Sequence, residues 1–187
     1  MTQHTPIPPR ELELFEGLKD IQVVFDVGAR ADTDYTRLKP WIELHAFEPN
    51  PEFFQQLKDA LGDRPNTYLN PYGLGDKEEE QGYNNGRQMF LGGEETSELY
   101  GDQTLKLRTL DSYVAEHGIE RIDFLKIDVE GYDFKVLQGG FNTIPKCHYI
   151  QYEYWNDRLQ YHGLLEDRFD MLYYGWRNVL CTNRTWS

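Results

Sequence analysis

The stretch that decides the fold is Ile122–Asp133, which reads IDFLKIDVEGYD. Its first half is a short apolar run of the length expected for a strand buried on both faces. The run breaks off at Asp128 and Glu130, and a helix-like stretch follows. Carboxylates at the carboxyl end of a parallel strand face the crevice in which open α/β sheets bind ligands. We therefore expect Asp128 and Glu130 to face a small-molecule site; the alternative is that Asp128 caps the next helix and that Glu130 is solvated.

Composition favours one folded domain with an acidic surface. The 187 residues are enough to bury a core, and 39% apolar with 14% aromatic content makes an unstructured chain implausible. The 32 acids and 19 bases give a formal charge of −13. That balance argues against nucleic acid or an anionic membrane as a partner, because both require concentrated Lys and Arg.

The two cysteines, Cys147 and Cys181, are isolated and lack the spacing of a metal site, which is typical of reduced thiols in a cytosolic protein. No apolar run reaches the roughly 18 residues of a membrane helix, and residues 1–9 lack the core of a signal peptide. We therefore expect a soluble cytoplasmic protein, and the sequence does not indicate an oligomeric state.

Two further strands, predicted at residues 21–27 and 42–47, also end in residues suited to a ligand. Gly28 follows the first strand and permits a tight turn with close approach of a ligand to the backbone. Glu48 follows the second strand, at about the distance from Gly28 at which an acid binds ribose hydroxyls in βαβ nucleotide folds. The alternative for Glu48 is a solvated loop acid.

The loop after the third predicted strand, residues 67–70, contains Gly75 and Asp76. Asp76 is able to accept a hydrogen bond from the exocyclic amine of a flat ring, although a simple turn explains the same composition equally well. Residues 78–100 are expected to form a hairpin or lid inserted in the sheet, with a turn at Asn85 and Gly86, or else a mobile polar loop.

The remaining elements complete an alternating pattern of strands and helices. Asn50 and Thr109 are expected to cap helices that begin at the next residue. The predictions are a loose arm over 1–9, helices over 11–19, 32–38, 51–61, 110–116 and 164–174, strands over 104–107 and 148–155, and two closing strands within 176–186 around a turn at Thr182 and Asn183. This alternation predicts one α/β domain over residues 1–187 with a doubly wound, mostly parallel sheet.

The segments resemble the FkbM family of S-adenosylmethionine-dependent methyltransferases, and the matches occur in family order over residues 21–155. The matching stretches are Val24–Ala29 (VFDVGA), His45–Asn50 (HAFEPN), Gly73–Asp76 (GLGD), Thr109–Tyr113 (TLDSY) and Phe124–Asp133 (FLKIDVEGYD). Isolated Asp-Val-Gly-Ala would be weak evidence, whereas the ordered set is specific.

The resemblance implies a class I methyltransferase, Rossmann-like, with seven strands of which the last is antiparallel. It implies S-adenosyl-L-methionine as cofactor and methylation of a hydroxyl on a small molecule or glycan. The implied cofactor-binding residues are Asp26, Gly28, Ala29, Arg30, Glu48, Pro49, Asn50, Gly75, Asp76 and Asp128. Among these, the first three line the methionine part, Glu48 binds the ribose and Asp76 lies near the adenine.

Methyl transfer to an alcohol requires removal of a proton, and Asp128 is the first candidate for the base or for orienting the acceptor. Glu130 is the second candidate, and Lys126 either supports the site or crosses the sheet. A divalent cation is another route to an acidic hydroxyl, with Asp128 and Glu153 as ligands and Asp157 as an outlying helper.

The first loop departs from the family pattern Gly-Ala-Asn-x-Gly, because Arg30 replaces the Asn and Asp32 replaces the second Gly. Asp32 is expected to crowd the cofactor, whereas Arg30 is able to grip its carboxylate. The alternative function is therefore a degenerate, non-catalytic nucleotide-binding module of the same fold. An NAD-dependent dehydrogenase would require the motif Gly-x-Gly-x-x-Gly. Only Gly28 of that motif is present, so this class of enzyme is disfavoured.

Overall fold

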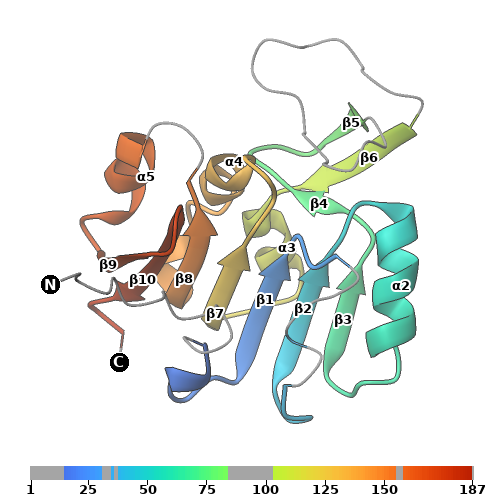
Figure 1. The fold of residues 1–187 in the computed structure, drawn as a ribbon, viewed down its shortest axis with the longest axis horizontal. Helices are drawn as coiled ribbons and strands as arrows, with labels where there is room; N and C mark the ends of the chain where they lie inside the picture. The colour runs from blue at the N-terminus through green and yellow to red at the C-terminus, as the bar shows by residue number, and fades with distance from the viewer. Residues whose placement is uncertain (1–14, 31–34, 36–37, 84–102, 155–157, 187) are drawn as a thin grey trace, which may run out of the picture.

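The computed structural model describes residues 15–30, 35, 38–83, 103–154 and 158–186 (Figure 1). Its elements follow one another in the alternating order expected of an α/β chain. They are β1 (Val23–Val27), β2 (Glu43–Phe47), α2 (Pro51–Leu61), β3 (Thr67–Asn70), β4 (Gly73–Leu74), β5 (Glu79–Tyr83), β6 (Gln103–Arg108), α3 (Leu110–Glu116), β7 (Ile122–Ile127), α4 (Asp133–Gln138), the 3-10 helix η2 (Ile144–Lys146), β8 (Cys147–Glu153), α5 (Arg158–Leu165), β9 (Phe169–Tyr174) and β10 (Asn178–Asn183).

Seven of the ten described strands form one sheet in the order β3-β2-β1-β7-β8-β10-β9. The pairs β1 with β2, β1 with β7, β2 with β3 and β7 with β8 are all parallel. β10 runs antiparallel to both of its neighbours, β8 and β9. The mostly parallel, doubly wound sheet and the antiparallel last strand predicted from the sequence are confirmed.

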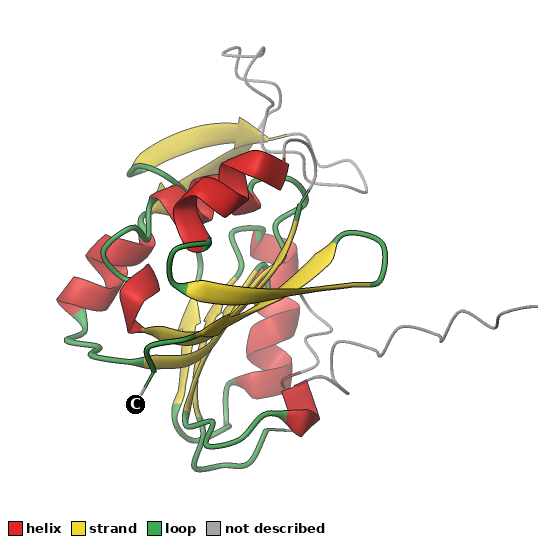
Figure 2. Cartoon of the chain, turned by 90° about the vertical axis from the view of Figure 1, so that its left-hand side faces the viewer, coloured by secondary structure: helices red, strands yellow, loops and turns green. Residues whose placement is uncertain are grey.

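Helices cover both faces of this sheet (Figure 2). On one face, Leu57 and Leu61 of α2 pack with Phe15 and with residues of β1, β2 and β7. The ring of Phe15 lies edge-on to that of Phe124, with 5.1 Å between centroids, so the segment that precedes β1 covers the sheet as expected. The other face holds a larger core built from α3, α4 and α5.

Two predicted helix starts are confirmed by their caps. The Asn50 side chain accepts hydrogen bonds from the backbone N–H groups of Glu52 and Phe53, and Pro51 opens α2. The Thr109 hydroxyl accepts from the N–H of Ser112 at the start of α3. Because α2 and α3 begin directly after their caps, the loops leading from β2 and β6 are short.

A second sheet, in the order β4-β6-β5, lies beside the carboxyl ends of β2 and β3 (Figure 1). β5 and β6 pair antiparallel, from Glu79 with Leu107 to Tyr83 with Gln103. The inserted hairpin is therefore built from β5 and the strand predicted over 104–107. The turn predicted at Asn85 and Gly86, the arm over 1–9 and most of the helix over 32–38 lie outside the described residues.

Two predictions made for the last quarter of the chain are wrong. The helix predicted over residues 164–174 is wrong, because α5 ends at Leu165 and, after a turn, β9 occupies Phe169–Tyr174. The predicted turn at Thr182 and Asn183 is also wrong, because β10 is one continuous strand there and Thr182 pairs with residues on both sides. The chain reverses at Gly175, whose φ is +60°, so the aromatic-rich β9 forms a hairpin with β10 instead of a helix.

Within the described part of the chain, every helix is too short or too polar to cross a bilayer.

Candidate functional site

Three neighbouring parallel strands, β2, β1 and β7, bring acidic residues together near their carboxyl ends. Asp26 lies within β1, Glu48 follows β2 directly and Asp128 follows β7 directly. Asp26 pairs in register with Ala46 on one side and with Lys126 on the other. The acids that the sequence predicted at successive strand ends are therefore gathered around the end of β1.

The loop after β1 is wedged between the ends of its two neighbours. The backbone N–H groups of Gly28 and Ala29 both donate to the Phe47 carbonyl, at 3.0 and 3.1 Å. Gly28 has a φ of +82°, and a Cβ at this position would lie 2.0 Å from the Asp128 carbonyl oxygen. Gly28 is therefore required by the packing of β1 against β7, a reason that the sequence analysis did not give.

Glu48 is 2% exposed, so it is not a solvated loop acid. One carboxylate oxygen accepts from the N–H of Arg30 at 2.9 Å and the other from the N–H of Asn50 at 2.8 Å. Burial raises the pKa of the Glu48 carboxyl, and these two N–H donors oppose the rise. Each oxygen keeps a lone pair with which it is able to accept a further hydrogen bond.

Arg30 adopts a left-handed conformation, with φ at +49°, and its N–H thereby points to Glu48. Its side chain is exposed, and its guanidinium lies over the ring of Phe53, 5.3 Å from the centroid. Asp32, the other departure from the family pattern, lies outside the described residues.

Lys126 links the buried and exposed acids of the site. Its Nζ lies 3.2 Å from Asp26 Oδ1 and 3.6 Å from Asp128 Oδ2. The Asp26 side chain is fully buried, whereas that of Asp128 is 42% exposed. Lys126 therefore contacts both acids, and its supporting role in the site stays a prediction. Asp128 does not cap the next helix, because the N-cap of α4 is Tyr132, which makes no side-chain cap bond.

Asp133 lies next to the site and was missed by the sequence analysis as a candidate. Its carboxyl is fully buried, and it accepts from the N–H groups of Gly131 and Glu153. Burial raises the pKa of Asp133 to about 8, with the charge of Asp128 adding to the rise. An acid at the first position of a helix is the signal that the sequence offered, but its burial depends on the end of β8.

The loop after β4 forms the other side of the candidate site. Asp76 Oδ2 lies 3.3 Å from Lys135 Nζ, while Asp76 Oδ1 is buried without a hydrogen-bond partner among the described residues. The ring of Tyr132 closes on Gly75, where a Cβ would lie 3.0 Å from Cε1. The loop after β2 is nearby, because the Pro49 ring would lie 3.4 Å from a Cβ on Gly73.

Two of the predicted acids lie on the far side of Asp128. Glu130 is in the turn after β7 with a φ of +53°, and Glu153 ends β8. In the described residues, no three His, Cys, Asp or Glu side chains are grouped in a way that suits a metal ion. The cation site at Asp128 and Glu153 stays a prediction, and Asp157 lies outside the described residues.

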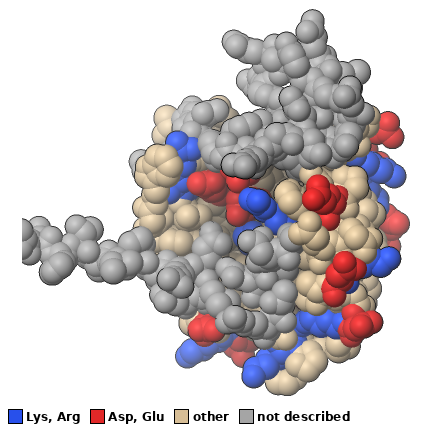
Figure 3. Space-filling view, turned by 45° about the vertical axis from the view of Figure 1, so that its right-hand side comes forward, with Lys and Arg blue, Asp and Glu red and all other residues tan. Residues whose placement is uncertain are grey.

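Figure 3 shows acidic and basic side chains next to one another in a hollow of the face that it presents.

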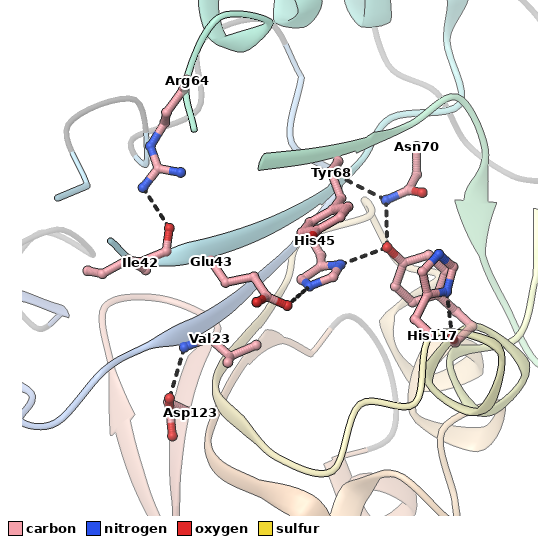
Figure 4. Close-up of polar contacts among 10 residues, drawn as sticks. Val23, Ile42, Glu43, His45, Arg64, Tyr68, Asn70, His117 and Asp123 are labelled. Carbon is pink, nitrogen blue, oxygen red and sulfur yellow. Dashed lines mark hydrogen bonds and ion pairs between the residues drawn. The ribbon is translucent and has the colours of Figure 1, made fainter. Parts of the chain in front are cut away.

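A second polar group lies on the face of the sheet covered by α3 and reaches the end of β3 at Asn70 (Figure 4). Tyr72 donates to Asn70 Oδ1, and Asn70 Nδ2 donates to the Tyr113 hydroxyl. The Glu43 carboxylate can only accept, so His45 Nε2–H donates to it at 2.7 Å; Nδ1 of the neutral ring then accepts from the Tyr113 hydroxyl at 2.7 Å. Burial lowers the pKa of His45, in agreement with a neutral ring, so this chain of hydrogen bonds is satisfied internally.

A family model described as the Methyltransferase FkbM domain matches residues 26–181. The match begins at Asp26, near the end of β1, and includes β2, β7 and all of the acids described above.

Two curated proteins are similar in sequence. The 2-O-methyltransferase NoeI of Sinorhizobium fredii is 26% identical over 163 residues, with 76% of this chain and 67% of the relative covered. The hexuronic acid methyltransferase AglP of Haloferax volcanii is 26% identical over 138 residues, with 73% and 57% covered. The chain therefore spans about three-fifths to two-thirds of the length of these relatives.

Solved structures share the fold at low sequence identity. A methyltransferase FkbM from Methylobacillus flagellatus superposes with a TM-score of 0.60 at 15% identity, over 89% of this chain and 45% of that one. An rRNA methylase from Streptococcus thermophilus gives 0.55 at 16% identity, over 94% and 97%. The architecture is that of class I methyltransferases.

Proposed function

The chain belongs to the Methyltransferase FkbM domain family, and on that premise we propose that it is an S-adenosylmethionine-dependent O-methyltransferase that acts on a hydroxyl of a sugar or another small molecule. The observation that carries the proposal is the gathering of Asp26, Glu48 and Asp128 around the Gly28 loop, at the carboxyl ends of neighbouring parallel strands. Open α/β sheets bind nucleotides at the carboxyl ends of their strands.

The residues present fit the cofactor in two places. Glu48 keeps a free lone pair on each oxygen after its backbone contacts, which suits the two hydroxyls of a ribose. Asp76 Oδ1, buried and without a partner among the described residues, suits the exocyclic amine of adenine. Arg30 is exposed on the loop after β1 and is the cation that we assign to the carboxylate of the methionine part.

S-adenosylmethionine, when bound, supplies a methyl group activated by a positively charged sulfur. The chain must then hold the acceptor oxygen in line with that methyl and accept its proton. Asp128 is the residue that we assign to this task, because its carboxylate is partly exposed at the end of β7. Lys126, held between Asp26 and Asp128, fixes the position of that carboxylate. Glu130 is the second candidate.

The names of the two curated relatives favour a carbohydrate acceptor, since one is a 2-O-methyltransferase and the other a hexuronic acid methyltransferase. We extend that class of acceptor to this chain. Family membership favours an enzyme over a non-catalytic module, and the cytoplasmic location stays a prediction. A divalent cation held by Asp128 and Glu153 is the second route to an acidic hydroxyl.

Calorimetric titration with S-adenosylhomocysteine tests the cofactor site. Glu48→Gln replaces two acceptor oxygens, one for each ribose hydroxyl, by a single carbonyl oxygen. A hydrogen bond to a charged group is worth about 1.5–3 kcal/mol, which is the binding free energy that the variant should lose. We therefore expect Kd to rise roughly 10- to 100-fold. Glu52→Gln, at an exposed position in the first turn of α2, is the control and is expected to leave Kd unchanged. Unchanged affinity in Glu48→Gln removes the ribose assignment.

Methyl transfer is tested with S-adenosylmethionine labelled on the methyl group and a panel of neutral and uronic acid methyl glycosides. We expect labelled product from the wild type and, in Asp128→Asn, retained S-adenosylhomocysteine affinity with turnover slowed about 10²- to 10⁴-fold. Transfer that persists in Asp128→Asn would reduce this residue to a structural role. Loss of transfer on adding EDTA, restored by Mg²⁺, would favour the cation route over a carboxylate base.

A further inference from the structure

The turn that follows β7 has an unusual backbone. Glu130 and Gly131 are consecutive residues with positive φ, at +53° and +98°. For a residue with a Cβ such as Glu130, the left-handed conformation costs about 1–2 kcal/mol. A turn of this kind persists where the surrounding structure holds it.

The carboxyl of Asp133 holds this turn. Its Oδ2 accepts from the N–H of Gly131 at 3.2 Å, within the turn itself. Its Oδ1 accepts from the N–H of Glu153 at 3.2 Å, at the last residue of β8. One side chain therefore connects the turn after β7 with the end of the neighbouring strand.

Burial makes this arrangement costly as well as specific. Asp133 is fully buried, and a buried carboxyl is stable only when its oxygens are hydrogen-bonded. The pKa of Asp133, raised to about 8, reflects the same cost. Besides an interaction with its own backbone N–H, the Asp133 carboxyl accepts from Gly131 in the turn after β7 and from Glu153 at the end of β8.

We infer that Asp133 is a positioning residue that sets the location of Asp128, and with it the geometry of methyl transfer, by bracing the turn after β7 against the end of β8. The backbone of Asp128 is already fixed on its other side, since its N–H donates to Val27 and its carbonyl packs on Gly28. Asp133 fixes the side that leads away from the strand. The inference rests on the proposed function, because it assigns Asp128 to the reacting end.

The test compares Asp133→Asn, Asp128→Asn and the double variant. An amide at position 133 accepts only one of the two N–H donors, so the brace is broken whether the acid is ionised or neutral. The matched control is Asp111→Asn, since Asp111 also lies in the first turn of a helix and accepts from the backbone of Asn142 and Thr143, away from Asp128. Asp133→Ser, which retains one acceptor, replaces Asp133→Asn if the latter does not fold.

In Asp133→Asn we expect transfer to the glycoside panel to slow about 10- to 100-fold, because a misplacement of about 1 Å costs up to that much. Affinity for S-adenosylhomocysteine should change less than about threefold, and the double variant should be no slower than Asp128→Asn. Backbone hydrogen exchange should accelerate at Gly131 and Glu153. Asp111→Asn should leave the rate and these two amides unchanged.

The failures can be told apart. Normal transfer in Asp133→Asn, or losses that multiply in the double variant, overturns the inference while the proposed function stands. If the wild type methylates none of the glycosides, the proposed acceptor class fails, and the brace is judged by hydrogen exchange alone. Unchanged exchange at Gly131 and Glu153 in Asp133→Asn would then refute it.

Discussion

Replacing Gly28 by alanine is the sharpest test of how the site is assembled. The new Cβ would lie 2.0 Å from the Asp128 carbonyl oxygen and 3.1 Å from Val129 Cγ1, whereas ordinary contact begins at about 3.4 Å. The obstacle is backbone, so rotation of a side chain cannot relieve it. β1 and β7 must separate at the point where Asp26, Lys126 and Asp128 meet.

The cost has two parts. A residue with a Cβ at a φ of +82° loses about 1–2 kcal/mol, and forcing atoms into a packed site costs about 1–3 kcal/mol more. The total is about 2–5 kcal/mol. For a chain of this size, each kcal/mol lowers Tm by about 2–4 °C, so we expect a fall of roughly 4 to 20 °C.

Two other glycines separate the two parts in the same thermal unfolding assay. Gly118 has a φ of +64°, and a Cβ added there would meet no atom within 4 Å, so Gly118→Ala should show the backbone cost alone, about 1–2 kcal/mol. Gly163 in α5 has neither obstacle, and Gly163→Ala should stabilise the chain by about 0.5–1 kcal/mol. If Gly28→Ala is no more destabilising than Gly118→Ala, the close packing of Gly28 on the Asp128 carbonyl does not exist as described.

Three further predictions concern charge and burial. Lys126→Met removes a cation from the fully buried Asp26 and should lower the free energy of unfolding in urea by about 3 kcal/mol. The control Lys135→Met, whose partner Asp76 is partly exposed, should lower it by less than about 1 kcal/mol. Equal losses would contradict the buried pair. Because the folded-state pKa of Asp133, about 8, lies above its unfolded value, the folded state holds that proton more tightly, so its contribution to stability is complete below about pH 4 and declines as the pH rises to 8. The stability advantage of the wild type over Asp133→Asn in urea should therefore shrink between about pH 5 and pH 8, and a constant difference would show that Asp133 titrates normally. Burial raises the pKa of Cys181 to about 12 and raises that of Cys147 as well, so neither thiol should react with a disulfide reagent before the chain unfolds, and rapid reaction of one thiol would place it at the surface.

The sequence predicted those elements whose local signals agree with their tertiary environment. β7 is an apolar run bounded by charged residues, and α2 has both its cap at Asn50 and Pro51 at its first position. β9 was mistaken for a helix because its apolar residues suit either period. Its pairing with β10, which no local signal announces, decides the outcome.

In the candidate site, too, the features with local signals could be predicted and those that depend on tertiary contacts could not. The positions of Glu48 and Asp128 at strand ends follow from chain order and parallel pairing, and both could be predicted. The contact of Lys126 with Asp26 depends on the register between β1 and β7, which the sequence does not reveal. Asp133, at the start of α4, was missed because its partner Glu153 is twenty residues away at the end of β8, and only the folded arrangement buries the carboxyl.

The chain of hydrogen bonds beneath the sheet has a consequence for how this protein can diverge. Its donors all run one way, from Tyr72 through Asn70, Tyr113 and His45 to Glu43. A substitution that reverses one step, such as Asn70→Asp, sets two acceptors against each other at His45 unless the ring gains a second proton, which its burial disfavours. Related chains should therefore have exchanged these five positions as a group, and their covariation would record the direction in which the protons point.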